Sequence, residues 1–187
     1  MQNTKHKTQN KIIPQKFFEK PTLEVTENLL GKYLVRKTGG KTIAGIITEL
    51  EAYVGETDLA CHAAKGRTKR TEIMYQDAGT LYVYMIYGMF YCLNVVTEKK
   101  DFPSAILIRA VKVDGIDSMA TSGPGKLCKI LKIDRKFNGL KLGKKSGLWI
   151  EDRGIKIKKS QIIKSKRIGV DYAGHCKDYL WRFSIKI

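Results

Sequence analysis

The stretch from residue 79 to residue 96 constrains the fold more than any other part of this sequence. It is GTLYVYMIYGMFYCLNVV, and it divides at Tyr87-Gly88 into two apolar runs. Alternating apolar and aromatic residues on both sides of a turn are typical of two paired β-strands. We therefore expect a β-hairpin with Tyr87 near its tip. The period of two places Tyr82, Tyr84 and Ile86 on one face of this hairpin and Leu81, Val83 and Met85 on the other.

Turn and helix signals divide the rest of the chain into short elements. A helix is expected over 22–30, where Pro21 marks its start and Gly31 its end. The pair Gly39-Gly40 predicts a turn between a strand at 33–36 and a long strand at 42–54. The other expected elements are a strand at 105–113, helices around 116–120 and 125–131, and short strands separated by basic turns from residue 146 onward.

These elements predict a single domain of the α+β class. We expect a curved antiparallel β-sheet with a protruding β-hairpin and flanking helices over residues 17–187. Residues 1–16 are polar and basic without periodicity, so a flexible tail is expected there. The chain has no internal repeat, and no apolar run approaches the roughly 18 residues that a membrane span needs.

Charge is distributed unevenly along the 187 residues. The chain has 35 Lys and Arg against 18 Asp and Glu, a formal net charge of +17. Residues 141–187 hold thirteen basic and four acidic side chains, and residues 1–20 hold five lysines and one glutamate. This excess predicts a polyanionic partner, above all nucleic acid. No membrane is expected as a partner, because the chain lacks a long apolar run. Without a secretory signal, the expected location is cytoplasmic, bacterial-type and nucleoid-associated, or otherwise intracellular with DNA.

The cysteines predict small buried thiols and no metal site. Cys61, Cys92, Cys128 and Cys176 are isolated, and no C-x-x-C pair is present. Two adjacent pairs, Cys61-His62 and His175-Cys176, could in principle meet at a metal ion, which is the less favoured interpretation. Disulfides are not expected in a chain without a secretory context.

Four acidic residues, Glu49, Glu51, Glu56 and Asp58, lie within ten positions. Such a cluster is electrostatically costly near an anionic partner unless some of the acids serve a chemical purpose. In the expected strand 42–54, Glu49, Glu51 and Tyr53 share one face, so a glutamate beside a stacking ring could act as a general base. Spacing alone favours the alternative, which is acids on a solvated strand face.

The tyrosines of the hairpin and His62 also have two interpretations. Buried tyrosines usually belong to a core, but aromatic rings next to a basic surface also suit base stacking, which contributes about 1–3 kcal/mol per base. His62 precedes the basic segment 65–70. It could donate a hydrogen bond to a substrate or a phosphate, or it could simply cap a loop.

Six segments that follow one another in the chain resemble one known family. They are ELEAY at 49–53, ACH at 60–62, GTLYVYMIYGM at 79–89, CLN at 92–94, LIRA at 107–110 and GPGKLC at 123–128. Together they are similar to the alkyladenine (3-methyladenine) DNA glycosylases of the type related to the mammalian enzyme. The resemblance begins at about Phe17 and covers nearly all of the remaining chain.

This resemblance implies a monofunctional DNA N-glycosylase that hydrolyses the bond between a damaged purine and deoxyribose. The expected lesions are of the 3-methyladenine, hypoxanthine and ethenoadenine class, and the products are a free base and an abasic site. The expected partner is damaged double-stranded DNA, from which the nucleotide is flipped out. The enzyme would act as a monomer, with no cofactor and no metal.

The resemblance also implies roles for the residues of the reaction site. Glu51 matches the general base that activates the attacking water, and Arg109 matches a residue near that water. Four residues match the pocket of the flipped base: Tyr53, His62, Tyr84 and Asn94. Asn94 is the one expected to disfavour the exocyclic amino group of guanine.

The resemblance also implies that further residues contact the duplex. Tyr87 matches the wedge that fills the gap left by the flipped nucleotide, and Met89 matches a residue beside the lesion in the groove. Arg70 and Lys126 lie in matching segments and are candidate phosphate contacts.

Two segments depart from the family pattern. Thr68-Lys69-Arg70-Thr71 stands where family members often have Pro and Asn near the Arg, and Val111-Lys112-Val113 replaces an acidic residue and a proline. Without the resemblance, the residues leave two other functions open. One is a non-catalytic RNA- or DNA-binding module, and the other is a formyl- or acyl-transfer domain on a related sheet.

Overall fold

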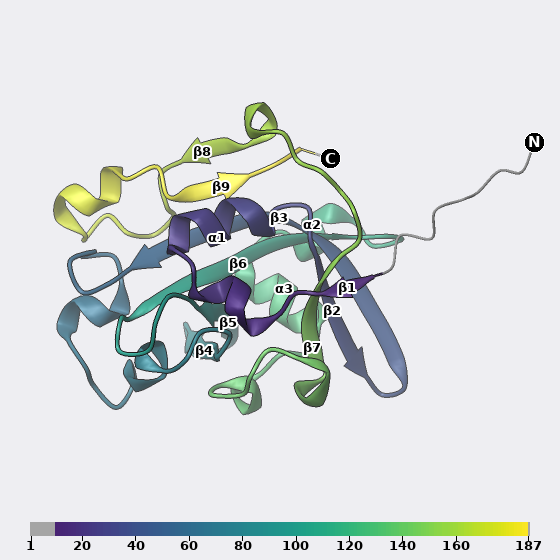
Figure 1. Cartoon of the computed structure of the whole chain (residues 1–187), viewed down its shortest axis with the longest axis horizontal. Coiled ribbons are helices and arrows are strands. Elements are labelled where there is room, and N and C mark those ends of the chain that lie inside the picture. Colours follow the sequence, from purple (N-terminus) through teal and green to yellow (C-terminus); the bar gives the residue numbers. More distant parts are fainter. Residues whose placement is uncertain (1–9, 187) are drawn as a thin grey trace, which may run out of the picture.

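A nine-stranded antiparallel sheet forms the centre of the structure, a computed structural model that describes residues 10–186 (Figure 1). Seven strands follow one another across it in the order β1-β7-β2-β3-β6-β5-β4, while β9 pairs with both β3 and β8. The strands are β1 (Lys11–Ile12), β2 (Tyr33–Thr38), β3 (Lys41–Val54), β4 (Leu81–Ile86), β5 (Phe90–Val96), β6 (Ser104–Val113), β7 (Leu148–Asp152), β8 (Ile163–Ser165) and β9 (Arg182–Ser184).

The helices of the structure are short. They are α1 (Thr22–Leu29), α2 (Ser118–Thr121) and α3 (Pro124–Ile130). Single 3₁₀ turns occur at Gln15–Glu19, His62–Lys65, Glu72–Tyr75, Arg135–Phe137, Lys144–Ser146, Lys159–Gln161 and Gly174–Asp178. None of the helices within residues 10–186 is long and apolar enough to cross a membrane.

Strand β3 organises the sheet. One of its edges pairs with β6 from Gly45 to Val54, whereas the other pairs first with β2 and then with β9 at Glu49–Glu51. The register with β6 shifts between Ile47 and Leu50, which marks a β-bulge. A bulge bends its strand and increases the local twist. This bend accounts for the curvature of the sheet and lets β2 and β9 share one edge of β3.

Helices cover both faces of the sheet (Figure 1). Helix α1 lies in front of the strands in this view and buries Thr22, Val25, Thr26 and Leu29. Helices α2 and α3 lie behind the strands, where α3 packs against β5 and β6. A Cβ atom on Gly125 of α3 would lie 2.9 Å from Cβ of Phe90. Glycine at this position therefore allows α3 to approach the hairpin closely.

The predicted fold class is confirmed, and the elements lie close to their expected bounds. The expected hairpin consists of β4 and β5, and the φ angles of Tyr87 and Gly88 at its turn are 51° and 69°. Positive φ at both central residues matches the twist of the flanking strands. The expected helix 22–30 ends one residue earlier, at Leu29, and the strand expected at 33–36 extends to Thr38. All four cysteines are buried free thiols.

The N-terminal segment differs in part from the expected flexible tail over 1–16. Residues 1–9 lie outside the described residues. Strand β1, however, pairs with β7 through Lys11↔Asp152 and Ile12↔Glu151, and the amide of Ile13 donates to the carbonyl of Ile150 at 2.9 Å. Residues 10–16 therefore belong to the folded body. The reason is that the apolar pair Ile12-Ile13 meets the otherwise unpaired edge of β7, and long-range strand pairing of this kind leaves no local periodicity.

Candidate active site

A cavity of about 350 Å³ lies beside β3, and most of the predicted site residues line it. Ligand pockets range from about 300 to 1,000 Å³, so this volume suits a compact ligand. Its walls come from β3, β4, β5, β6, the start of α3 and the segment 168–172. The predicted residues that line it are Glu51, Tyr53, His62, Tyr84, Tyr87, Asn94 and Arg109.

Glu51 is fully buried in the fold but borders this cavity. Its Oε2 accepts hydrogen bonds from the Tyr53 hydroxyl at 2.9 Å and from Arg109 Nη1 at 3.3 Å. Its Oε1 accepts from the backbone N–H of Ile168 at 2.8 Å. Both oxygens act as acceptors, so three donors from three different segments fix the orientation of the carboxylate.

Arg109 on β6 links Glu51 to a second carboxylate. Its Nε donates to Glu49 Oε1 at 3.0 Å, and Arg182 Nη1 contacts the same oxygen at 3.2 Å. Burial alone would lower the pKa of Arg109, but the neighbouring carboxylates of Glu51 and Glu49 outweigh it and raise the pKa. Arg109 therefore remains a cation at the cavity. Glu49, by contrast, does not line the cavity and accepts a hydrogen bond from Arg109 outside it.

Aromatic rings form one wall of the cavity. The ring centroids of His62 and Tyr84 are 4.7 Å apart in an edge-to-face arrangement, and those of Tyr82 and Tyr84 are 5.2 Å apart. Burial raises the pKa of Tyr84, and burial together with the Glu51 carboxylate raises the pKa of Tyr53 well above 10. Both phenols therefore remain protonated, and Tyr53 is a hydrogen-bond donor to Glu51.

His62 and Asn94 supply polar groups at this wall. Nδ1 of His62 lies 2.9 Å from the Tyr82 hydroxyl, and burial, together with the cations Arg70 and Lys65, lowers the pKa of His62 to about 4. The imidazole is therefore neutral at pH 7. Nδ2 of Asn94 donates to the carbonyl of Tyr82 at 3.1 Å and approaches the carbonyl of Cys92 at 3.5 Å, which fixes the side-chain amide in place.

The predicted DNA contacts lie around the cavity rather than deep inside it. Tyr87 lines the cavity at the hairpin turn and is 87% exposed, and Met89 is 67% exposed but does not line the cavity. The guanidinium of Arg70 lies over the ring of Tyr84, 5.3 Å from its centroid. Lys126 Nζ donates to the carbonyl of Met119 at 3.0 Å and so joins α3 to α2. Neither Arg70 nor Lys126 lines the cavity.

Sequence reasoning missed one complete wall of the cavity. Ile168, Gly169, Val170 and Tyr172 all line it, and Tyr172 is 70% exposed at its rim. This segment follows β8 in a region where the sequence predicts only short strands and basic turns. No local pattern marks this segment, because the burial of the charged residue Arg167 that precedes it becomes visible only in the structure.

The two Cys-His pairs do not form a metal site. Within residues 10–186, no group of three or more His, Cys, Asp and Glu side chains is arranged to hold a metal ion. Cys92 does line the cavity, where burial raises the pKa of its thiol to about 11. It is a neutral thiol at pH 7.

Comparison with known proteins agrees with this fold and site. Residues 16–187 match the family model described as methylpurine-DNA glycosylase (MPG). The chain is 42% identical to a protein of Clostridium perfringens (91% of this chain, 93% of that protein) and 45% identical to one of Methanocella arvoryzae (92% and 91%). It is 46% identical to one of Bdellovibrio bacteriovorus (94% and 95%). All three are provisionally named 3-methyladenine DNA glycosylases.

The chain belongs to the methylpurine-DNA glycosylase family. It is accordingly a monofunctional DNA N-glycosylase, a hydrolase of N-glycosyl bonds that acts on DNA in repair. The resemblance seen in the sequence is thereby confirmed, as is the enzyme class.

Proposed function

We propose that this enzyme, acting as a monomer, extrudes damaged purines from duplex DNA into the cavity beside β3 and hydrolyses their N-glycosidic bonds. The proposed lesions are 3-methyladenine, hypoxanthine and ethenoadenine, and the products are the free base and an abasic site. One observation supports the proposal above all. The carboxylate of Glu51 borders a cavity of about 350 Å³ and is held there by three hydrogen-bond donors.

In the proposed reaction, Glu51 acts as the general base. A water molecule between the carboxylate and the sugar attacks C1′, and its proton passes to Glu51 as the C–O bond forms. The C1′–N bond breaks, and its electron pair leaves with the purine. The transition state resembles an oxocarbenium ion, so a carboxylate close to the sugar also stabilises the developing positive charge. Arg109 and Tyr53 hold the carboxylate while it accepts the proton.

The aromatic wall accounts for the proposed lesion class. An extruded purine would stack between the rings of Tyr53 and Tyr84, with neutral His62 at its edge. Rings attract a cation placed over their faces, and an alkylated purine such as 3-methyladenine carries positive charge and is a good leaving group. Hypoxanthine and ethenoadenine are neutral and would rely on stacking alone. Asn94 is held by two backbone carbonyls, so it would exclude the amino group of guanine by its volume.

The exposed residues around the cavity would contact the duplex. Extrusion of a nucleotide costs a few kcal/mol of stacking and pairing. An aromatic or apolar side chain at a hairpin tip can offset this loss, which is the role that we assign to Tyr87, with Met89 beside it in the groove. Arg70 and Lys126 are proposed to contact the phosphates.

The variant Glu51→Gln tests the proposal. General-base assistance contributes about 10²–10⁴-fold, so the single-turnover rate of base release should fall by that factor while the amide retains the shape of the pocket. The affinity for lesion-containing duplex should remain within about threefold. The measurement is release of each base of the lesion panel, together with binding by fluorescence anisotropy and matched undamaged duplexes.

Glu151→Gln is the matched control. Glu151 is also a buried glutamate with aromatic and arginine donors, Trp149 Nε1 at 2.6 Å and Arg153 Nε at 2.9 Å, but it lies outside the cavity. It should retain the wild-type excision rate. Near wild-type excision by Glu51→Gln would refute the assigned role of Glu51.

A further inference from the structure

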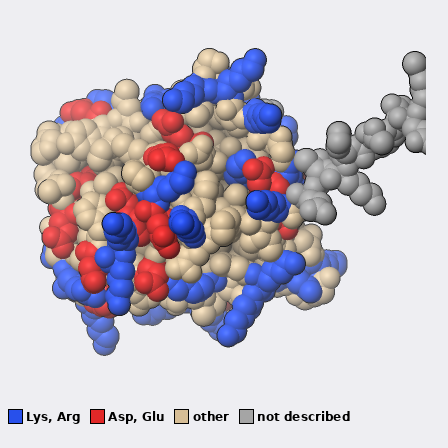
Figure 2. All heavy atoms as spheres, in the orientation of Figure 1, with Lys and Arg blue, Asp and Glu red and all other residues tan. Residues whose placement is uncertain are grey.

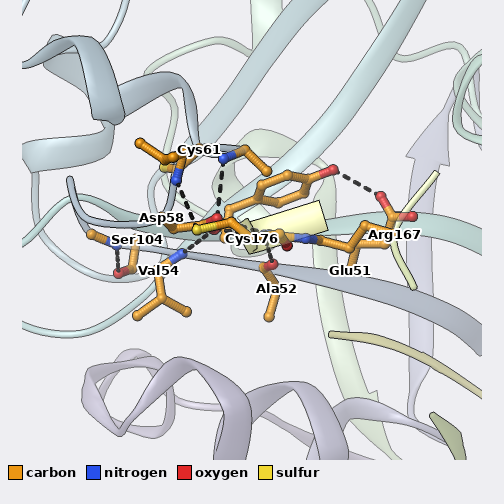
Figure 3. Close-up of polar contacts among 12 residues, drawn as sticks. Glu51, Ala52, Val54, Asp58, Cys61, Ser104, Arg167 and Cys176 are labelled. Atoms are coloured by element: carbon orange, nitrogen blue, oxygen red, sulfur yellow. Dashed lines mark hydrogen bonds and ion pairs between the residues drawn. The ribbon is translucent and has the colours of Figure 1, made fainter. Parts of the chain in front are cut away.

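A buried ion pair joins the acidic cluster to the segment that closes the cavity (Figure 3). Asp58 follows β3, and Arg167 follows β8 more than one hundred residues later. Arg167 Nη1 lies 2.5 Å from Asp58 Oδ2, and Nη2 lies 2.8 Å from Oδ1. Both residues are nearly inaccessible to solvent. The carboxylate and the guanidinium thus form a two-bond fork between segments that are distant in sequence.

The surroundings leave this pair little freedom. Arg167 also donates to the carbonyl of Ala52 at 2.9 Å and to that of Cys176 at 3.1 Å. Asp58 accepts in addition from the backbone N–H of Val54 at 3.2 Å and of Ala60 at 3.1 Å. The guanidinium also lies against two rings, 4.9 Å from the centroid of Tyr53 and 5.1 Å from that of Trp181. Its position and orientation are therefore fixed from every side.

The residue after Arg167 contacts Glu51 directly. The backbone N–H of Ile168 donates to Glu51 Oε1 at 2.8 Å, and residues 168–170 and Tyr172 form the missed wall of the cavity. The ring of Tyr53, on which the guanidinium lies, carries the hydroxyl that donates to the other oxygen of Glu51. Arg167 is thus next to two of the three groups that donate to Glu51. The Ile168 N–H follows it directly in the chain, and the ring of Tyr53 lies against its guanidinium.

Stability alone does not account for this pair. The removal of two charges from water offsets most of their attraction, so buried ion pairs contribute little net stability compared with apolar residues of the same volume. In addition, Nε of Arg167 is a buried side-chain donor without a partner. A buried orphan donor costs about 1–3 kcal/mol, which calls for an explanation other than stability.

We propose that Asp58 and Arg167 are positioning residues that hold the Ile168 N–H and the Tyr53 ring against Glu51. The inference rests on the proposed role of Glu51 as the general base. Neither Asp58 nor Arg167 contacts the substrate in this scheme. Their effect on the reaction passes entirely through the placement of the Glu51 carboxylate.

A double-mutant cycle tests this dependence. Asp58→Asn retains the shape of the side chain but removes its charge, so the fork loosens and Glu51 shifts. Misplacement by about 1 Å can cost about 10²-fold in rate, and we expect Asp58→Asn to lower single-turnover excision 10- to 100-fold with unchanged affinity for lesion duplex. In the Glu51→Gln background the same substitution should lower the residual rate less than threefold, because residues that act as one unit are not additive.

An equal loss in both backgrounds, or no loss with Glu51 present, would overturn the inference. The excision rate is normalised to active enzyme by titration with duplex that contains an abasic-site analogue, so a smaller folded fraction does not imitate the effect. Failure of the underlying proposal is distinguishable, since it would show as a near wild-type rate for Glu51→Gln alone. Asp178→Asn is the local control. It breaks the exposed Lys166–Asp178 ion pair next to Arg167 and should leave the rate within twofold.

A second pair of variants decides the matter if Asp58→Asn does not fold. Gly169→Ala and Gly115→Ala both place a side chain at positive φ, 74° and 75°, and a Cβ at either position meets no atom within 4 Å. The two variants share the same backbone strain, but only Gly169 lies on the cavity wall. Gly169→Ala should lower excision at least about fivefold by shifting the Ile168 N–H, with Gly115→Ala unchanged. Equal rates for the two would overturn the inference, because they would show that excision does not depend on the placement of the Ile168 N–H that Asp58 and Arg167 are proposed to hold.

Discussion

His62 is a residue whose charge state is determined by its neighbours. An isolated histidine has a pKa of about 6.5 and would be partly charged near neutral pH. Burial at the cavity and the cations Arg70 and Lys65 lower the pKa of His62 to about 4. The ring is therefore neutral at pH 7, and in the proposed pocket it would present an uncharged edge to a stacked base and would not repel a cationic purine. It also makes folding sensitive to acid, because the unfolded chain binds a proton that the folded chain rejects.

Because folding lowers the pKa of His62, the stability of the fold should depend on pH. Between pH 6.5 and pH 4 the unfolded state binds more protons at this position, so stability should decrease as the pH falls through that range. His62→Asn does not titrate and can still reach the Tyr82 hydroxyl. Relative to this variant, the wild type should lose about 1–2 kcal/mol between pH 7 and pH 5, measured by urea unfolding. Parallel pH dependence of the two proteins would contradict the assigned pKa.

The β4–β5 hairpin shows how an element combines fold and function. Its alternation places Tyr82, Tyr84 and Ile86 on the cavity side, while Leu81 and Val83 enter the core. Met85, on the core-facing side of the alternation, is half exposed because the hairpin extends past the sheet at this end. At the tip, Tyr87 adopts a left-handed backbone conformation, which is uncommon for an aromatic residue. The turn thus carries an exposed ring that no packing requirement explains.

Tyr87→Asn tests the wedge at the level of this element. Asparagine tolerates the left-handed conformation, and the side chain that it replaces is 87% exposed, so stability should change by no more than about 0.5 kcal/mol. Loss of one stacking contact of about 1–3 kcal/mol should weaken binding to lesion duplex about tenfold. Base extrusion can be followed by the fluorescence of 2-aminopurine beside the lesion.

Met85→Ala is the control for this experiment, since it removes an apolar side chain from the opposite face of the same hairpin. It should bind and extrude as the wild type does. If Tyr87→Asn extrudes the base with wild-type affinity, Tyr87 is not the wedge.

At the scale of the whole molecule, the net charge of +17 does not correspond to an evenly positive surface. On the face over α1, Asp and Glu side chains lie among the Lys and Arg side chains (Figure 2). Several lysines there or nearby are paired with acids, including Lys20 with Glu24 at 2.7 Å and Lys164 with Glu27 at 2.5 Å. Such lysines are poorly suited to neutralise phosphates. Only part of the basic excess is therefore expected to contact DNA. That part is expected to lie mainly in residues 141–187, but it does not include paired side chains such as Lys164.

The salt dependence of the DNA-binding constant measures how much of the positive charge contacts DNA. If about five phosphates are neutralised, the logarithm of the binding constant should fall with the logarithm of salt concentration at a slope near −4.5. Arg70→Ala should reduce the magnitude of the slope by about 0.9, whereas Lys20→Ala, which removes a paired lysine, should leave it unchanged. A wild-type slope near −1 would show that most of the charge never meets DNA.

Local patterns were sufficient to predict much of the fold, whereas most of the residues around the cavity were implied by the resemblance to the family. The period of two in 79–96 and in the strand around Glu51 determines which side chains share a face, so Tyr82 could be placed beside Tyr84, and Glu51 beside Tyr53, in advance. That Glu51, Tyr53 and Tyr84 meet at one site was implied only by the family resemblance. The segment 168–172 could not be predicted in this way. It has no regular structure, and Arg167, the residue that precedes it, pairs with Asp58 more than one hundred residues earlier.

The sequence by itself determined the hairpin, the faces of its strands, the strongly basic composition and the motifs that resemble the family. The hairpin and the faces of its strands follow from periodicity and turn preferences, which act between residues close in the chain. The composition and the motifs are properties of the sequence itself. Only the tertiary structure decided that Glu51 is buried and held by three donors, that Asp58 pairs with Arg167, and that Ile12 joins the sheet. These features come from contacts between distant segments, which burial and hydrogen bonding select only once the chain has folded.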